Sequence, residues 1–384
     1  MKAIAVLTLS LLWLNLFVAC APSELVSRPA VGTSPTIVAS PAPGEVRPAA
    51  VAGGFYPREP QALANMVDEM LAEVERAGDL PRLPAPPMAL IVPHAGYVFS
   101  GQVAAYAFHQ IRGAVYEAVV VVGTNHADPN FRKVSVYAKG AFQTPLGLVP
   151  VDEELAAQLL AADPQHLVFE RGVHRDEHSI EVVLPFLQRL LPGCRIVPII
   201  VGEPSPENTH ALSDVLMKVL AGKRALIIAS SDLSHYPSYD DARQVDAATL
   251  AAILTMDPEG FRRTIQEQER RHLRNLATCA CGEGPILTAM MAARGLGANQ
   301  AALLKYANSG DTPFGDRDQV VGYGAVAFWQ GSPLPFTPAV PSSTSSGLCL
   351  GIGFATKGEC PRDPKERERI GGILLETATF QANC

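Results

Sequence analysis

The stretch ALIVPHAGY (residues 89–97) places a histidine directly after an apolar run of strand length. The stretches AVVVVGTNH (118–126) and ALIIASSDLSH (225–235) also end in a histidine that follows such a run, and the three apolar runs span residues 89–92, 118–122 and 225–229. Continuous apolar runs of this length, with helical patterns between them, are typical of buried strands in a parallel or mixed sheet. The carboxyl ends of such strands open into the ligand crevice. We therefore expect the three histidines to line one cleft, as in a metal site or an acid–base site. They are His94, His126 and His235.

Strand-like and helix-like segments alternate between residues 51 and 329. Helices are expected over residues 60–77, 101–111, 152–160, 180–191, 208–220, 240–254 and 285–294, and further strands over 195–201 and 320–328. The alternation predicts an α/β fold, a three-layer αβα sandwich around a mixed, largely parallel central sheet. Pro198 argues against a central position for the strand at 195–201, because proline cannot donate to the hydrogen-bond ladder.

The composition argues against nucleic acid as a partner. The formal net charge is −7 at pH 7, and the chain has no basic cluster and no interleaving of basic with aromatic residues. A hydrophobic share of 48% is typical of a chain with a substantial buried core.

The amino terminus has the features of a bacterial signal segment. Lys2 precedes an almost wholly apolar run over residues 3–18. The run ends in FVAC (17–20), which resembles a lipobox with phenylalanine where leucine is commoner. We expect residues 1–20 to be a lipoprotein signal peptide and Cys20 to carry the lipid of an extracytoplasmic, membrane-tethered lipoprotein. An ordinary secretory signal and an uncleaved anchor are the alternatives.

The predicted signal peptide is followed by three further segments. Residues 21–49 are rich in proline and alanine and are expected to form an extended tether. The α/β domain is expected over residues 50–331. Residues 332–384 begin as a proline- and serine-rich linker and continue as an unassigned tail. The seven cysteines follow no legible disulfide framework.

Cys281 is a candidate metal ligand or reactive thiol. It precedes a predicted helix, and both a helix amino terminus and a metal ion favour the thiolate. The alternative is a buried inert cysteine, and Cys279, two residues earlier, is a rival for the same role.

Asp232 and His235 are three residues apart, so one loop or one helical turn can hold both. The aspartate could orient the imidazole, act as a ligand or cap the following turn. His235 could then act as a general acid or base. His178 and Glu181 could also face the cleft, and no role is assigned to them. The remaining histidines are expected to be structural. They are His109, His166, His174, His210 and His272.

Six segments, taken in order, resemble the Memo family, called AmmeMemoRadiSam system protein B in bacteria. They are AGGFYP (52–57), PHAGY (93–97), GTNH (123–126), EHSIE (177–181), SSDLSH (230–235) and CGEGPI (281–286). The resemblance covers about residues 51–329 and implies a fold similar to that of the class III extradiol dioxygenases, which use non-haem iron.

The resemblance also implies a set of site residues. The metal ligands of the family are two histidines and a cysteine, which fall on His94, His126 and Cys281, and the neighbouring aspartate and histidine fall on Asp232 and His235. The dioxygenases use a carboxylate where the thiolate stands here. A thiolate makes the site softer, which favours copper, zinc or thiolate-ligated iron and weakens the case for dioxygenase activity.

Three functions are consistent with these observations. The first is a metalloprotein that performs redox chemistry with iron or copper in a cleft lined by two histidines and a cysteine. The second is a non-catalytic module that binds a small molecule or a peptide. The third is hydrolysis assisted by zinc, with His235 or Asp232 as the base. A radical-SAM partner, which the family name implies, belongs in the cytoplasm and would be out of reach of an exported chain.

Overall fold

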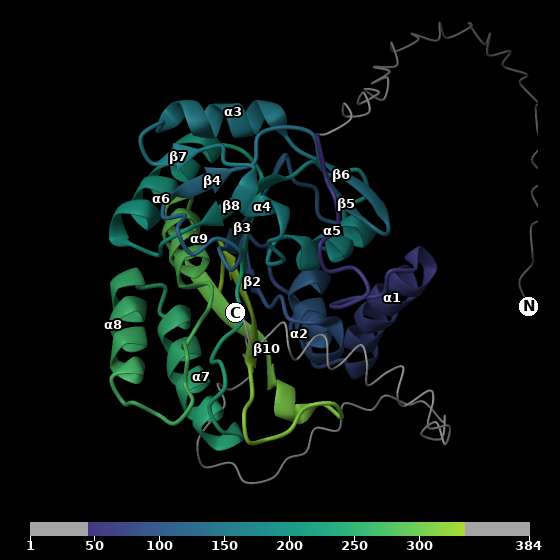
Figure 1. The fold of residues 1–384 in the computed structure, drawn as a ribbon, viewed down its shortest axis with the longest axis vertical. Coiled ribbons are helices and arrows are strands. Elements are labelled where there is room, and N and C mark those ends of the chain that lie inside the picture. Colours follow the sequence, from purple (N-terminus) through teal and green to yellow (C-terminus); the bar gives the residue numbers. More distant parts are fainter. Residues whose placement is uncertain (1–44, 335–384) are drawn as a thin grey trace, which may run out of the picture. The chain divides into compact units, whose positions relative to one another are not determined.

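Eight strands form the main sheet of residues 45–334, which are the residues that the computed structural model describes (Figure 1). Their order in the sheet is β10-β11-β2-β9-β3-β8-β4-β7. They are β2 (Ala89–Val92), β3 (Ala118–Thr124), β4 (Val134–Val136), β7 (Leu167–Val168), β8 (Val197–Val201), β9 (Ala225–Ser230), β10 (Gln300–Asn308) and β11 (Gly322–Trp329). The central strands β2, β9, β3 and β8 are parallel, whereas β11 and β4 pair antiparallel with β2 and β8. The predicted mixed, largely parallel sheet is confirmed.

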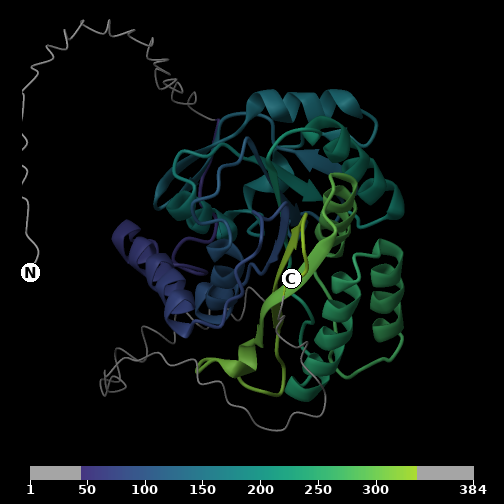
Figure 2. The same ribbon diagram turned by 180° about the vertical axis from the view of Figure 1, so that it is seen from behind.

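Helices cover both faces of this sheet. Figure 2 shows α1 and α2 on one side and α7 and α8 on the other. The first layer holds α1 (Pro60–Ala77), α2 (Tyr97–His109) and α5 (Leu184–Leu190). The second holds α3 (Glu153–Ala162), α6 (Pro206–Leu220), α7 (Tyr239–Leu254), α8 (Pro258–Glu269) and α9 (Glu283–Gly295). Helices α2 and α9 both contact β2, one from each layer. The predicted three-layer αβα sandwich is therefore confirmed.

Buried apolar side chains explain this arrangement. Every residue of β2, β8, β9 and β11 is buried, as expected for strands covered on both faces. Helix α1 is amphipathic and buries one stripe of its surface, because apolar residues recur at helical spacing. The stripe consists of Leu63, Val67, Met70, Leu71 and Val74. None of the helices within residues 45–334 is long and apolar enough to span a bilayer.

Pro198 lies inside the sheet, contrary to the expectation from its missing N–H. Strand β8 runs between β3 and β4. The last residue of β4 is Val136, which pairs with Ile199, so Pro198 faces Tyr137 just beyond the end of that strand. The carbonyl of Pro198 accepts a hydrogen bond from the Tyr137 amide at 2.8 Å. The pairing of β4 with β8 therefore loses only one hydrogen bond, which lies beyond its last residue pair, Val136 with Ile199.

A second, smaller sheet involves residues that precede the predicted domain. It has the order β1-β5-β6 and adds a strand from the stretch assigned to the tether. Its strands are β1 (Val46–Arg47), β5 (Ala141–Thr144) and β6 (Gly147–Pro150). Arg47 is only 3% exposed, so the described fold includes residues before position 50.

The other segments without a sequence prediction are short, apart from α8 and β10. They are β4, β7, α4 (Gly172–Arg175) and the 3₁₀ turn Ser309–Asp311, whereas the 3₁₀ turn Glu181–Val183 falls within a predicted helix. The helix predicted over 180–191 is divided into a 3₁₀ turn and α5, with Pro185 in the first turn of α5. The predicted signal peptide, Cys20, the tether up to residue 44 and the tail from residue 335 lie outside the described residues.

Candidate metal centre

The candidate site lies at the carboxyl ends of β2, β9 and β3, which are neighbours in the sheet. His94 is two residues past the end of β2, and His126 is two residues past the end of β3. The loop after β9 carries Asp232 and His235. The backbone amide of His94 donates to Oδ1 of Asp232 at 2.8 Å, which joins the loops after β2 and β9.

The structure brings the five sequence-predicted site residues together. One possible donor atom from each of His94, His126 and Cys281 lies within 4.8 Å of the other two, and the same holds for Asp232, His235 and Cys281. Nε2 of His94 is 3.4 Å from Sγ of Cys281. The rings of His94 and His126 have their centroids 5.2 Å apart and meet edge to face. Cys281 belongs to both groups, so the donors form one cluster around its sulfur.

Ser230 determines which nitrogen of His94 carries the proton. The Ser230 hydroxyl donates its single hydrogen to the Ser179 carbonyl at 2.6 Å. It can therefore only accept from Nδ1 of His94, which lies 2.9 Å away. Nδ1 of His94 is then protonated, and the lone pair of Nε2 faces the sulfur of Cys281. Burial, reinforced by His126, holds the pKa of His94 well below its usual range, so the ring is neutral.

Glu177 holds His126 through two hydrogen bonds. Oε2 accepts from the backbone amide of His126 at 2.6 Å, and Oε1 lies 3.0 Å from its Nδ1. Burial raises the pKa of Glu177, but the charge and hydrogen bond of His126 outweigh burial and hold this pKa well below the usual range. The ionised carboxylate can only accept, so Nδ1 of His126 donates. A carboxylate behind a histidine in this way orients the ring and makes it a better ligand.

Burial lowers the pKa of His126, but the charge of Glu177 and hydrogen bonds with Cys281 and Glu177 together outweigh burial and hold this pKa well above its usual range. The ring is therefore protonated on both nitrogens in the metal-free protein. When Nε2 serves as a ligand, its proton leaves, because Nδ1–H stays bonded to Glu177.

The backbone holds His235 in the same manner. Its Nδ1 lies 3.0 Å from the carbonyl oxygen of Leu233, which can only accept, so Nδ1 carries a hydrogen. Burial, partly offset by Asp232, lowers the pKa of His235 and favours the neutral ring with a lone pair on Nε2. Asp232 accepts from the backbone of His94 rather than from the ring of His235. It influences His235 through its charge.

Cys281 lies directly before helix α9, whose N-cap is Gly282. Its sulfur accepts from the backbone amide of Asp232 at 3.3 Å. Burial raises the pKa of Cys281, although the hydrogen bond with His126 opposes burial, so the metal-free site holds a thiol. Gly282 permits the close approach of this loop to β9, because a Cβ there would lie 2.6 Å from the carbonyl oxygen of Ser230.

These donors fit a metal ion in kind and in orientation. Two imidazoles and one thiolate suit iron, copper and zinc. All three histidines of the cluster hold Nδ1 in a hydrogen bond, which leaves Nε2 as the ligand atom. The residues therefore can hold such an ion without rearranging their supporting contacts.

Glu177 and His178 are site residues that the sequence analysis did not assign. His178 is buried, and its ring stacks on that of His126 with centroids 4.5 Å apart. Burial and the charge of His126 hold the pKa of His178 well below its usual range, so the stacked ring is neutral. His126, Glu177 and His178 also form a third group of possible ligands. The signal for both residues is the polar segment RDEHSIE (175–181), in which three acids and a histidine precede an apolar run.

The remaining candidates lie outside this cluster. Cys279 is fully buried, and its sulfur lies 4.0 Å from the carbonyl oxygen of Ile265. Burial raises the pKa of Cys279 to about 12, so it is an inert core thiol and no rival for Cys281. Glu181 pairs with Arg47 and belongs to none of the possible ligand groups of the described residues. The histidines expected to be structural are absent from the possible ligand groups of residues 45–334.

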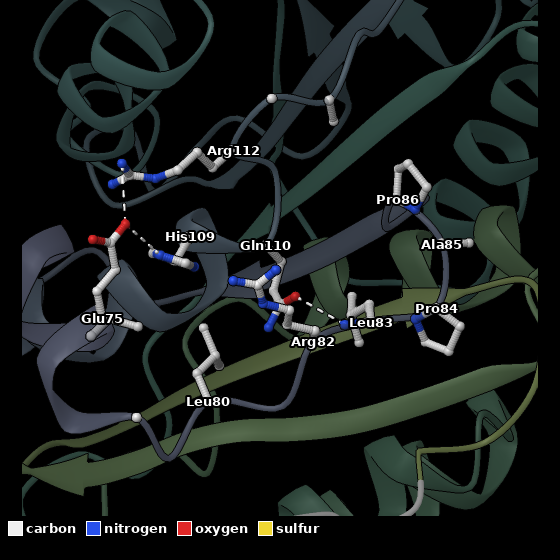
Figure 3. A pocket seen from close by; sticks show the side chains of 14 residues that line it. Glu75, Leu80, Arg82, Leu83, Pro84, Ala85, Pro86, His109, Gln110 and Arg112 are labelled. Atoms are coloured by element: carbon white, nitrogen blue, oxygen red, sulfur yellow. Dashed lines mark hydrogen bonds and ion pairs between the residues drawn. The ribbon is translucent and has the colours of Figure 1, made fainter.

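A cavity of about 800 Å³ lies elsewhere, between the carboxyl ends of α1 and α2 and the loop that follows α1. Figure 3 shows Glu75 between Arg112 and His109, within 3.2 Å and 3.3 Å respectively. Gln110 accepts from the Leu83 amide at 3.4 Å and so ties the loop to α2. None of the candidate metal ligands lines this cavity.

Comparison with known proteins identifies relatives over most of the chain. A family profile described as "Memo-like protein" matches residues 47–327. A MEMO1 family protein of Ignicoccus hospitalis is 36% identical over 299 residues, which are 76% of this chain and 99% of that protein. A MEMO1 family protein of Methanosarcina mazei is 38% identical over 286 residues, covering 73% of this chain and 98% of the relative. The crystal structure of the uncharacterized protein JW3007 from Escherichia coli K12 superposes with a TM-score of 0.41 at 14% identity, covering 62% of this chain and 98% of that one.

Proposed function

Because the chain belongs to the family of Memo-like proteins, we propose that it binds one iron or copper ion through His94, His126 and Cys281 and performs redox chemistry there. The observation that supports this proposal is the convergence of Nε2 of His94 and Sγ of Cys281 to 3.4 Å, with His126 in the same group. The sulfur and the imidazoles make a soft donor set, which suits copper, thiolate-ligated iron and zinc.

Bound iron or copper would supply one-electron chemistry and activation of oxygen or substrate, and the surrounding residues have separate tasks. Glu177 and Ser230 hold the rings of His126 and His94 in the orientation that presents Nε2. His235 offers an unprotonated Nε2 beside these proposed ligands, where it can take up a proton from a substrate. Asp232 stabilises the resulting imidazolium through its charge, since it raises the pKa of His235.

Elemental analysis of the purified protein with an absorption spectrum tests the proposal. Thiolate-to-metal charge transfer absorbs visible light for iron or copper and does not for zinc. We expect about one iron or copper per chain and loss of the absorption band in Cys281→Ser and His94→Ala. The matched controls are Cys194→Ser and His109→Ala, which change the same residue types outside the cluster. Undiminished metal content in both ligand variants would end the proposal.

Two other outcomes identify the alternative functions. Zinc in the isolated protein, with no response to oxygen or reductant, would support metal-assisted hydrolysis with His235 or Asp232 as base. Saturable binding of a small molecule or peptide, without metal and without turnover, would support a binding module.

We further propose that the chain is exported and anchored by a lipid on Cys20. The basis is the apolar run 3–18 followed by FVAC (17–20). An exported protein would act on extracytoplasmic small molecules or peptides and would not meet a cytoplasmic radical-SAM partner. In a bacterial host, the wild type is expected in the membrane fraction with a lipid attached, and Cys20→Ser is expected to carry no lipid. Recovery of the wild type in the cytoplasm would refute export.

A further inference from the structure

Arg47 connects the amino-terminal strand β1 to the segment that carries Glu177. Its guanidinium forms an ion pair with Glu181 and donates to the backbone carbonyl of Glu177. Its Nε donates to the carbonyl of His174 at 2.8 Å. The side chains of Arg47 and Glu181 are 2% and 0% exposed, so water does not compete for these bonds. One side chain therefore holds the backbone at residues 174 and 177 and the carboxylate of Glu181.

Glu181 completes the attachment of the amino-terminal segment. Its carboxylate accepts from the backbone amides of Ala50 and Val51 at 2.7 Å and 3.0 Å. It also accepts from the hydroxyl of Tyr56. The segment 47–56 is thus fixed at four points to the residues that follow Glu177.

The Glu177 peptide links this network to the cluster. Its carbonyl is held by Arg47, and its carboxylate holds both the backbone amide and Nδ1 of His126. The orientation of the carboxylate depends on the position of its own backbone. His94 depends on this segment less directly: Ser230 orients its ring, the Ser230 hydroxyl donates to the Ser179 carbonyl, and the Ser179 amide donates to Glu177. His235 lies outside this chain of bonds, because the Leu233 carbonyl orients its ring.

We propose that Arg47 is a positioning residue for His126, acting through Glu177, and that the first strand of the fold is therefore part of the metal site. This inference rests on the proposed metal binding, but its primary test needs no metal. A purely structural arginine would stabilise the fold without a selective effect on one histidine. Arg47 as a positioning residue affects His126 directly and leaves His235 unchanged.

The primary experiment is ¹H–¹⁵N spectroscopy of the full metal-free chain labelled in histidine. The Nδ1–H signal of His126, assigned with His126→Gln, reports its hydrogen bond to Glu177. We expect Arg47→Met to abolish or shift this signal as Glu177→Gln does, while the Nδ1–H signal of His235 keeps its position. Arg47→Lys retains the charge but lacks the planar guanidinium that bonds to all three acceptors at once. We therefore expect it to restore the His126 signal only in part.

Cobalt(II) titration of the same proteins is the second measurement, read at the thiolate-to-cobalt charge-transfer band. Loss of a partner that orients a ligand weakens metal affinity by about 10- to 100-fold. We expect about a 10-fold loss for Arg47→Met and no further loss when Glu177→Gln is added. Leu63→Ala, in the core of α1, is the control for general destabilisation.

The outcomes separate this inference from the proposed function. A wild type that fails to bind cobalt contradicts the proposed function, and the metal-free spectra still decide the role of Arg47. If Arg47→Met keeps the His126 signal and wild-type cobalt affinity while its Tm falls like that of Leu63→Ala, Arg47 is only structural and the inference is overturned. Should Arg47→Met fail to fold, Arg47→Lys decides the matter by the same His126 signal.

Discussion

His94 and Cys281 are 187 positions apart in the chain, yet Nε2 of the histidine lies 3.4 Å from Sγ of the cysteine. The histidine follows β2, and the cysteine precedes α9, a helix that packs on β2. Their meeting point therefore depends on the packing of a helix onto the central sheet. Substitutions therefore test the site best at residues that control this packing or the orientation of the two side chains.

Ser230→Ala is expected to weaken metal binding without removing a ligand. The hydroxyl of Ser230 accepts from Nδ1 of His94 and fixes the protonated nitrogen. Without it, a buried Nδ1–H loses its acceptor, and the affinity for a metal ion should fall about 10-fold, in the range for lost orienting partners. Competition against a chelator measures the change. The matched control is Ser213→Ala on α6, whose hydroxyl bonds within its own helix. Equal affinities of the two variants would contradict the role of Ser230.

Gly282→Ala is expected to destabilise the fold at the site. A Cβ there would lie 2.5 Å from Cβ of Ser231 and 2.6 Å from the Ser230 carbonyl oxygen. Ser230 is the last residue of β9, and Ser231 is the first residue of the loop that follows it. Overpacking of this kind costs about 1–3 kcal/mol, which urea denaturation would detect. Gly54→Ala is the control, since its nearest neighbour would be 3.6 Å away. Equal stability of both variants would show that the loop after β9 can move aside for the added Cβ, which would contradict the prediction.

Asp246→Asn is expected to remove a pH dependence of stability. Asp246 is fully buried, and burial raises its pKa to about 7, although the Ser234 amide opposes this. Between the unfolded pKa of about 4 and the folded pKa, the carboxyl group of Asp246 is protonated in the folded state and ionised in the unfolded state. The stabilisation is therefore complete below pH 4 and is lost as the pH rises through 7, by a few kcal/mol. Asparagine mimics the neutral carboxyl, so its stability relative to wild type should increase from pH 5 to pH 8. If urea denaturation gave the same stability difference between Asp246→Asn and the wild type at both pH values, Asp246 would not be a buried neutral acid.

Cys279→Ser and Cys281→Ser are expected to have opposite effects. Cys279 is buried in the core, and a serine there leaves a hydroxyl among apolar groups, which costs about 1–3 kcal/mol of stability and leaves metal binding intact. Cys281→Ser should abolish thiolate coordination with a smaller effect on stability. Thermal unfolding together with metal content distinguishes the two. Loss of metal in Cys279→Ser, with Cys281→Ser unaffected, would reverse the assignment.

The apolar runs of the sequence predicted the strands and the ends at which the site lies. Ala89–Val92 is β2 to the residue, and β9 extends the predicted run only by Ser230. This worked because strands covered on both faces are apolar throughout, so a polar residue such as His94 marks the end of the strand. In these strands, burial on both faces requires a continuous apolar sequence.

Glu177 could not be assigned in the same way. Its segment resembles the start of a helix, and nothing local shows that its carboxylate reaches His126, 51 positions earlier. Arg47 was likewise hidden, because it lies in a proline- and alanine-rich stretch that is typical of a tether. Both residues act through long-range contacts between irregular segments, for which neither hydrophobic periodicity nor residue spacing is informative.

The placement of β9 between β2 and β3 has a consequence for biosynthesis. Although β2 and β3 are successive strands of the main sheet, they never pair, and about a hundred further residues must leave the ribosome before the strand that separates them exists. The histidines after both strands are made early, whereas the cysteine emerges near the end of the domain. The three candidate ligands can therefore meet only after β9 and the loop before α9 have been made, so their convergence has to follow synthesis of most of the domain.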